Sequence, residues 1–193
     1  MTFDELLQNR RSIRDFEDKA VPHDVIEKII YDSIQAPNAA NRQPWSFIVI
    51  HNKDLMHRIS DASKHAILND IEKDPSHSMK DYEDILSMED FNVFFNAPCL
   101  VCIVGPQEEP LMEADCALAA CYFMFSATAR GLGTCWIGLG AELREQALRL
   151  QLGIPDGHRI YAPIIIGYPR EIPSLPERNP PRILKVIQEA VRK

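Results

Sequence analysis

The stretch from Leu111 to Ala129 limits the possible folds of this chain more than any other, because apolar side chains occupy nearly every side of the helix that it predicts. It includes a run of 14 residues without a charged residue, from Cys116 to Ala129, which Asp115 and Arg130 close. This run is too short to span a bilayer. The sequence therefore predicts a helix that is buried on most sides, and no membrane segment.

The other apolar segments show helical or strand spacing, without the evenly repeated strand–helix–strand units of a doubly wound sheet. Helices outnumber strands, which favours the α+β class and a single domain over residues 1–193. The expected helices cover residues 3–7, 25–34, 54–65, 111–129, 141–152 and 183–191. The expected strands cover residues 47–50, 99–104, 134–137 and 161–167.

Charge is spread unevenly over the chain, whose net charge is −7 and whose isoelectric point is near 5.4. Residues 60–95 carry nine acidic and three basic side chains, whereas residues 170–193 carry three acidic and six basic ones. Residues 66–90 are polar and show little periodicity, so we expect an exposed excursion there. The acidic balance argues against a nucleic-acid partner, because such binding depends on neutralising phosphates.

The five cysteines are an odd number without the density of a disulfide scaffold, which fits a reducing cytoplasm. Cys99 and Cys102 lie three apart on an expected strand, so they should face opposite sides and cannot share a metal. The six histidines show no metal-binding spacing, and we expect no metal site. The polar first helix, with Asp4 and Glu5, indicates no signal peptide.

Three arginines within five residues, Arg10, Arg11 and Arg14, stand out against the acidic balance. Like charges this close repel one another unless an anion neutralises them, so the segment indicates a site for a phosphate or another delocalised anion. The alternative is a solvated basic face at a helix end. Because the C-terminal segment is also basic, we expect the two ends of the chain to converge on one anion.

Two further motifs fit a planar ligand. Residues 36–45, APNAANRQPW, form a small polar loop that could press against a ring while its asparagine amides bond the ring's polar edge. In residues 131–138, GLGTCWIG, Gly131 and Gly133 follow a helix and precede a strand, which is the reverse of the dinucleotide-binding order and disfavours a Rossmann site. Gly138 lacks a Cβ beyond the strand end, which would let a flat ring approach the backbone.

These motifs, together with Arg178-Asn179-Pro180, resemble those of the FMN-dependent nitroreductase family over roughly residues 5–60 and 96–187. The resemblance implies a central, mostly antiparallel sheet flanked by helices, in a domain-entwined homodimer that shares its active sites. The helix at residues 116–129 is similar to the family's central dimer helix. Residues 60–95 do not align, and we expect them to form a variable acidic cover segment.

The resemblance also implies which residues bind FMN. Arg10 and Arg178 would hold the phosphate, Ser12 and Arg11 would assist near the ribityl chain, and Arg14 would lie beside the pyrimidine edge of the flavin. One further segment, with Pro37, Asn38, Ala39 and Asn41, would reach the flavin of the opposite subunit. Another, with Trp136, Ile137 and Gly138, would present backbone to the ring near N5. No catalytic side chain is implied, because the flavin supplies the chemistry.

The implied activity is that of an NAD(P)H-dependent FMN oxidoreductase. Hydride would pass from NADH or NADPH to FMN and then to a small electron-poor acceptor, such as a nitroaromatic or a quinone, in a ping-pong mechanism. Members of this fold also reduce activated alkenes, dehalogenate iodotyrosines or fragment the flavin. The alternative from another class is an FMN-binding sensor or storage dimer without nicotinamide turnover.

Overall fold

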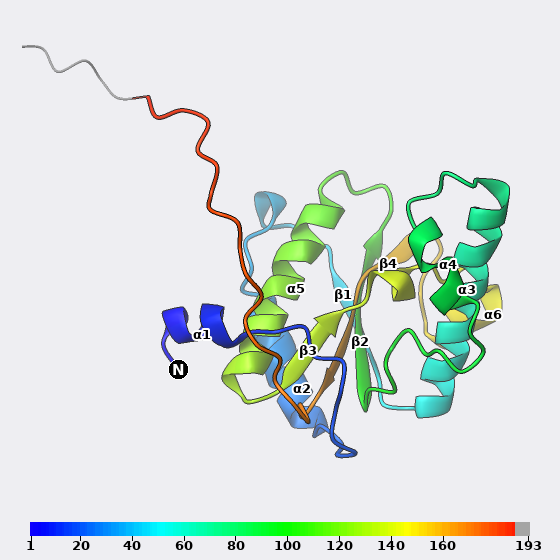
Figure 1. Cartoon of the computed structure of the whole chain (residues 1–193), viewed down its shortest axis with the longest axis horizontal. Coiled ribbons are helices and arrows are strands. Elements are labelled where there is room, and N and C mark those ends of the chain that lie inside the picture. Colours follow the sequence, from blue (N-terminus) through cyan, green and yellow to red (C-terminus); the bar gives the residue numbers. More distant parts are fainter. Residues whose placement is uncertain (188–193) are drawn as a thin grey trace, which may run out of the picture.

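A four-stranded antiparallel sheet, in the order β1–β2–β4–β3, forms the centre of the computed structural model, which describes residues 1–187 (Figure 1). The strands are β1 (Ser46–Ile50), β2 (Cys99–Pro106), β3 (Gly133–Trp136) and β4 (His158–Gly167). Each neighbouring pair is antiparallel. The expected antiparallel sheet and α+β class are confirmed.

Helices cover both faces of this sheet (Figure 1). One side holds α1 (Phe3–Asn9), α2 (His23–Ser33) and α5 (Met112–Ala129). The other side holds α3 (Lys53–Lys73), α4 (Glu83–Leu86) and α6 (Gln146–Gln151). Three short 3₁₀ turns complete the elements: η1 (Ala39–Asn41), η2 (Lys80–Tyr82) and η3 (Gly138–Ala141).

The buried strand β2 separates two hydrophobic clusters, because successive side chains of a strand point to opposite faces. Cys99 packs into the cluster that contains α2 and α5, and Cys102 packs into the cluster that contains α3. Their expected opposite orientation is therefore confirmed. Burial raises the pKa of both thiols to about 12, so each is protonated at neutral pH.

Four expectations about the elements need correction. Helix α3 continues to Lys73 instead of ending near residue 65, and the excursion after it contains η2 and α4. The helix expected at residues 141–152 is replaced by η3 and the shorter α6. Residues 183–187 are not helical, and the rest of the helix expected at 183–191 lies outside the described residues. Helix α5 leaves Leu118 and Tyr122 each 40% exposed, so its burial is not complete within one chain.

The C-terminal arm, residues 171–187, is exposed throughout and runs away from the body of the protein (Figure 1). Large apolar side chains occur along it, including Ile172, Leu175 and Leu184. An exposed apolar arm of this length is unusual for a surface that faces only water.

Candidate functional site

The arginine segment at residues 10–14 runs alongside β3. The N–H of Ile13 donates a hydrogen bond to the carbonyl oxygen of Thr134 (2.9 Å), and Ser12 forms a parallel bridge with Thr134. Ile13 is buried, and a Cβ built on Gly133 would lie only 2.7 Å from its Cγ1 atom. Ile13 therefore fixes the segment against the sheet.

Side chains on the other side of this segment gather around Cys135 of β3. Burial raises the pKa of the Cys135 thiol, and the nearby Arg14 guanidinium, a hydrogen bond from Ser12 and the Arg10 guanidinium oppose that rise. Burial also raises the pKa of the Cys121 thiol on α5, and the Arg10 guanidinium opposes part of that rise. Alternation along the extended segment places three of the predicted residues, Arg10, Ser12 and Arg14, on one side of it.

Arg11 lies apart from this group. In an extended segment, alternate side chains point in opposite directions. Arg11 accordingly lines a separate cavity of about 150 Å³ with Asn9, Ile13 and Thr128. Its Nη1 donates to the carbonyl oxygen of Arg10 (2.8 Å). The arrangement separates Arg11 from the side of the segment that carries Arg10, Ser12 and Arg14.

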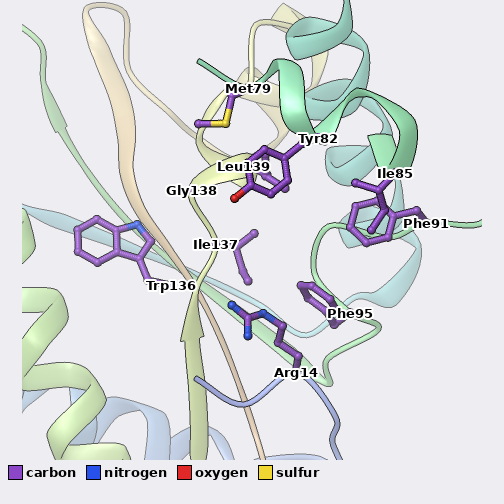
Figure 2. A pocket seen from close by; sticks show the side chains of 10 residues that line it. All are labelled: Arg14, Met79, Tyr82, Ile85, Phe91, Phe95, Trp136, Ile137, Gly138 and Leu139. Atoms are coloured by element: carbon purple, nitrogen blue, oxygen red, sulfur yellow. The ribbon is translucent and has the colours of Figure 1, made fainter. Parts of the chain in front are cut away.

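A cavity of about 300 Å³ lies where the arginine segment, the end of β3 and the cover segment meet (Figure 2). Arg14 enters from one side, Met79 and Tyr82 lie opposite, and Phe91 and Phe95 form an aromatic wall between them. The cavity brings together four predicted residues with six that were not predicted. The predicted ones are Arg14, Trp136, Ile137 and Gly138, and the others are Met79, Tyr82, Ile85, Phe91, Phe95 and Leu139.

Phe95 connects the aromatic wall to Arg14. The Arg14 guanidinium carbon lies 5.6 Å from the centroid of the Phe95 ring, within the range of a cation–π interaction. Phe91 meets Phe95 edge to face, with the centroids 5.9 Å apart. Phe95 and Asn96 have φ of +52° and +51°, left-handed values that are uncommon for residues with a side chain. The wall is therefore held in a strained backbone conformation, as often found at functional sites.

The sequence did not predict the cover-segment residues of the cavity, because the dominant pattern in residues 60–95 is their acidic charge. The signal was present in the sequence as large apolar residues among the acidic ones, at positions 79, 82, 85, 91 and 95. Their spacing fits neither one helix nor one strand, since they come from the residue before η2, from η2 and α4, and from the loop that follows.

Gly138 presents open backbone beside this cavity. A Cβ built on Gly138 would meet no atom within 4 Å, and its φ is not positive. Neither packing within the chain nor backbone conformation therefore explains a glycine at this position. The opposite holds for Gly140, where a Cβ would lie 2.4 Å from Phe94.

The predicted loop at residues 37–41 does not line this cavity and instead packs against the start of α5. The N–H of Ala39 donates to Asp115 Oδ1 (3.1 Å), and the N–H of Gln43 donates to Asn38 Oδ1 (2.9 Å). Ala40 and Asn41 have φ of +50° and +54°, so this loop is also strained. Within one chain, the loop and the cavity are separate features.

Arg178 lies on the exposed C-terminal arm. The far end of that arm leaves the body of the protein (Figure 1). In residues 1–187, no helix is both long enough and apolar enough to cross a membrane.

Comparison with known proteins identifies the family. The family model described as the nitroreductase family matches residues 7–168. An Archaeoglobus fulgidus protein, provisionally named NADH dehydrogenase/NAD(P)H nitroreductase, is 28% identical over 186 residues, which cover 92% of this chain and 94% of the relative. The Bacillus subtilis protein YfhC, provisionally named an NAD(P)H nitroreductase, is 26% identical over 92% of this chain and 90% of its own length.

Solved structures share the fold. A nitroreductase with bound FMN from Bacteroides fragilis superposes with a TM-score of 0.79 at 24% identity, covering 96% of this chain and 97% of that one. An iodotyrosine deiodinase bound to FMN and 3-iodo-L-tyrosine superposes with a TM-score of 0.75 at 18% identity, covering 96% of this chain and all of that one. Together with the family match over most of the chain, these similarities show that the chain belongs to the nitroreductase family of oxidoreductases.

Proposed function

We propose that this protein binds FMN and transfers hydride equivalents from NADH or NADPH to a small, flat, electron-poor acceptor. The observation that carries this proposal is the open backbone of Gly138 at a cavity that also holds Arg14. A glycine that the chain does not need for its own packing is explained by a ring lying against it. The FMN-bound relatives support the same ligand.

The side chains present suit the chemical parts of FMN. Arg10 and Ser12 would hold the phosphate and the ribityl chain, because guanidinium groups and hydroxyls are good donors to phosphate. Arg14 would hold the pyrimidine edge, where a cation stabilises the negative charge of a reduced flavin. Trp136, Ile137 and Gly138 would present backbone to the ring. Bound FMN would supply the redox chemistry, accepting hydride from NAD(P)H and then reducing the acceptor in a ping-pong sequence.

The remaining predicted residues would serve a homodimer. The loop of Pro37, Asn38, Ala39 and Asn41 lies away from the cavity of its own chain, which fits its proposed role at the flavin of a partner. The exposed arm with Arg178 fits a partner-covering segment, since its apolar side chains lack cover in one chain. The phosphate would then be held by Arg10 of one subunit and Arg178 of either subunit.

The acceptor class follows from the walls of the cavity. Most of the lining is apolar or aromatic, and Arg14 is the charged residue that lines it. A flat, uncharged or anionic aromatic compound fits this lining better than a cation does. Nitroaromatics, quinones and halogenated phenols share these properties. Halogenated phenols are included because the fold is similar to that of an iodotyrosine deiodinase.

The five cysteines of the chain are free, and four of them are buried. Free thiols are stable in a reducing compartment, which supports a cytoplasmic location.

A visible absorption spectrum of the purified protein, recorded before and after anaerobic addition of NADH and then NADPH, tests the proposal. We expect a flavin spectrum that bleaches with at least one donor and recovers when a quinone is added. A flavin spectrum that persists with both donors would instead support a sensor or storage protein. No flavin binding after FMN is added would refute the cofactor assignment.

A further inference from the structure

One face of α3 carries three polar side chains that bind the segment following α4. Asn92 Nδ2 lies 3.0 Å from His57 Nδ1, and the N–H of Val93 donates to Ser60 Oγ (3.0 Å). Lys64, one helical turn after Ser60 and two after His57, contacts the same segment. Positions 57, 60 and 64 share one side of a helix because they are separated by three and four residues.

Lys64 makes the largest number of these contacts. Its ammonium group donates to the carbonyl oxygens of Phe91 (2.8 Å), Met88 (3.3 Å) and Glu89 (3.4 Å). The side chain is only 7% exposed, and its partner Asp61, at 3.2 Å, is more than half exposed. A buried ammonium is costly unless its donors are satisfied. Here the N–H donors of the ammonium group are satisfied mainly by backbone carbonyl groups of one four-residue turn, residues 88–91.

The anchored turn carries the aromatic wall of the cavity. Phe91 is itself a carbonyl partner of Lys64, and its ring lines the cavity next to Phe95. Asn92 Oδ1 accepts from the N–H of Phe94 (2.7 Å), and the N–H of Phe95 donates to the carbonyl oxygen of Asn92 (2.9 Å). The chain of contacts therefore runs from α3, through the turn, to Phe95 and the Arg14 guanidinium above its ring.

We propose that Lys64, assisted by Ser60, is a positioning residue that holds the Phe91–Phe95 wall in place and so determines how tightly the acceptor binds. Lys64 does not line the cavity, so its effect passes through the backbone of residues 88–93. Without the ammonium, three carbonyl groups lose a partner, and the turn is expected to open. The inference rests on the proposed function, because it assumes that the acceptor binds beside the flavin in this cavity, against the Phe91–Phe95 wall.

Four variants test the inference. Lys64→Met removes the ammonium and keeps an unbranched apolar side chain, whereas Lys64→Arg keeps a charged donor. Ser60→Ala removes one contact at lower risk to folding, and Lys73→Met is the control, because Lys73 is an exposed lysine on the same helix. For each protein, amide hydrogen exchange of residues 88–95 and the FMN dissociation constant are measured. The kcat and KM for 1,4-benzoquinone with the donor that bleaches the wild type are measured as well.

For Lys64→Met, we expect exchange in residues 88–95 to rise about tenfold or more and the quinone KM to rise about tenfold. The kcat and the FMN dissociation constant should stay within about threefold of wild type. Of the residues proposed to hold FMN, Arg14 touches the wall, and its segment is fixed to β3 through Ile13, not through Lys64. Ser60→Ala should shift exchange and KM in the same direction by a smaller factor, Lys64→Arg should restore part of the loss, and Lys73→Met should change neither.

Unchanged exchange in Lys64→Met would overturn the anchoring itself. Raised exchange with an unchanged quinone KM, or equal losses in kcat, KM and FMN affinity, would overturn the positioning role. If Lys64→Met does not fold, Ser60→Ala decides between the same outcomes. A wild-type flavin that neither NADH nor NADPH bleaches would refute the proposed function instead, and hydrogen exchange would still show whether Lys64 anchors the wall.

Discussion

Two glycines, one in β3 and one just after it, occupy their positions for different physical reasons. Gly133 is required by packing, because a Cβ there would lie 2.7 Å from the buried Ile13 side chain. Gly138 faces open space and has no such requirement within the chain. The first glycine therefore belongs to the folding of the arginine segment, and the second is best explained by a ligand.

This difference predicts opposite results for two alanine substitutions. Gly138→Ala should leave the stability of the FMN-free protein within about 0.5 kcal/mol of wild type. It should weaken FMN binding about tenfold or more, because the new methyl group meets the ring. Gly133→Ala should destabilise the FMN-free protein by about 1–3 kcal/mol through overpacking against Ile13. Thermal denaturation and FMN titration of both variants test this. Equal FMN affinity of Gly138→Ala and wild type would contradict the proposed ring position.

Arg10 gives a second prediction at the scale of single residues. It lies on the same side of the extended segment as Ser12 and Arg14, so Arg10→Ala should weaken FMN binding about ten- to a hundredfold, the loss expected for one charge-assisted hydrogen bond to phosphate. Riboflavin, which has no phosphate, should bind wild type and Arg10→Ala equally well. Arg58→Ala, an exposed substitution on α3, is the control. A riboflavin loss as large as the FMN loss would place Arg10 somewhere other than the phosphate.

At the scale of elements, α5 acts as a support for the loop at residues 37–41. Asp115 is buried in the first turn of α5, and its Oδ1 accepts from the N–H of Ala39 across 76 positions of the sequence. Its Oδ2 has no hydrogen-bond partner among the described residues. The left-handed Ala40 and Asn41 next to this contact show that the loop is held against its local preference.

Removing this support should release the loop. Asp115→Ala leaves the Ala39 N–H without its acceptor, so we expect a stability loss of about 1–3 kcal/mol. If the loop reaches a flavin, dissociation of FMN should also become several-fold faster. Asp24→Ala, an exposed substitution on α2, serves as the control because its ion pair with Lys28 lies on the surface. Stopped-flow release of FMN after dilution measures the effect, and an unchanged rate in a folded Asp115→Ala would separate the loop from the cofactor.

At the scale of the whole molecule, the uncovered apolar surface argues for a dimer. Leu118 and Tyr122 emerge from α5, Phe3 and Leu7 from α1, and the arm adds several more apolar side chains. Helices α1 and α5 lie on the same side of the sheet (Figure 1). A second copy that covers this side would account for an α5 whose sequence is apolar on nearly every face.

A charge on this surface should disrupt the dimer. We expect the wild type to be a dimer by light scattering and Leu118→Glu to weaken the association about tenfold or more, because a carboxylate would be buried in an apolar interface. Leu150→Glu is the matched control, since Leu150 is an exposed leucine on α6, on the opposite side of the sheet. FMN affinity should fall with dimer content in Leu118→Glu. A monomeric wild type that binds FMN tightly would refute the shared site.

Much of this protein was determined by the sequence alone, because the relevant signals are local. The capping box of Thr2 and Glu5 sets the start of α1, and the alternation along β2 sends Cys99 and Cys102 to different clusters. The arginine segment and the glycine motif after α5 indicated the family from short stretches of residues, and the family match confirmed it.

Only the tertiary structure decided how the site is assembled. The wall of Phe91 and Phe95, its anchor Lys64 and the separation of Arg11 from Arg10 all depend on which side of a segment faces which neighbour. Side-chain direction in irregular segments has no fixed period, and the bonds that orient it join residues far apart in sequence. The sequence of the acidic cover segment therefore did not predict that its apolar side chains line a cavity. Only the folded chain shows this.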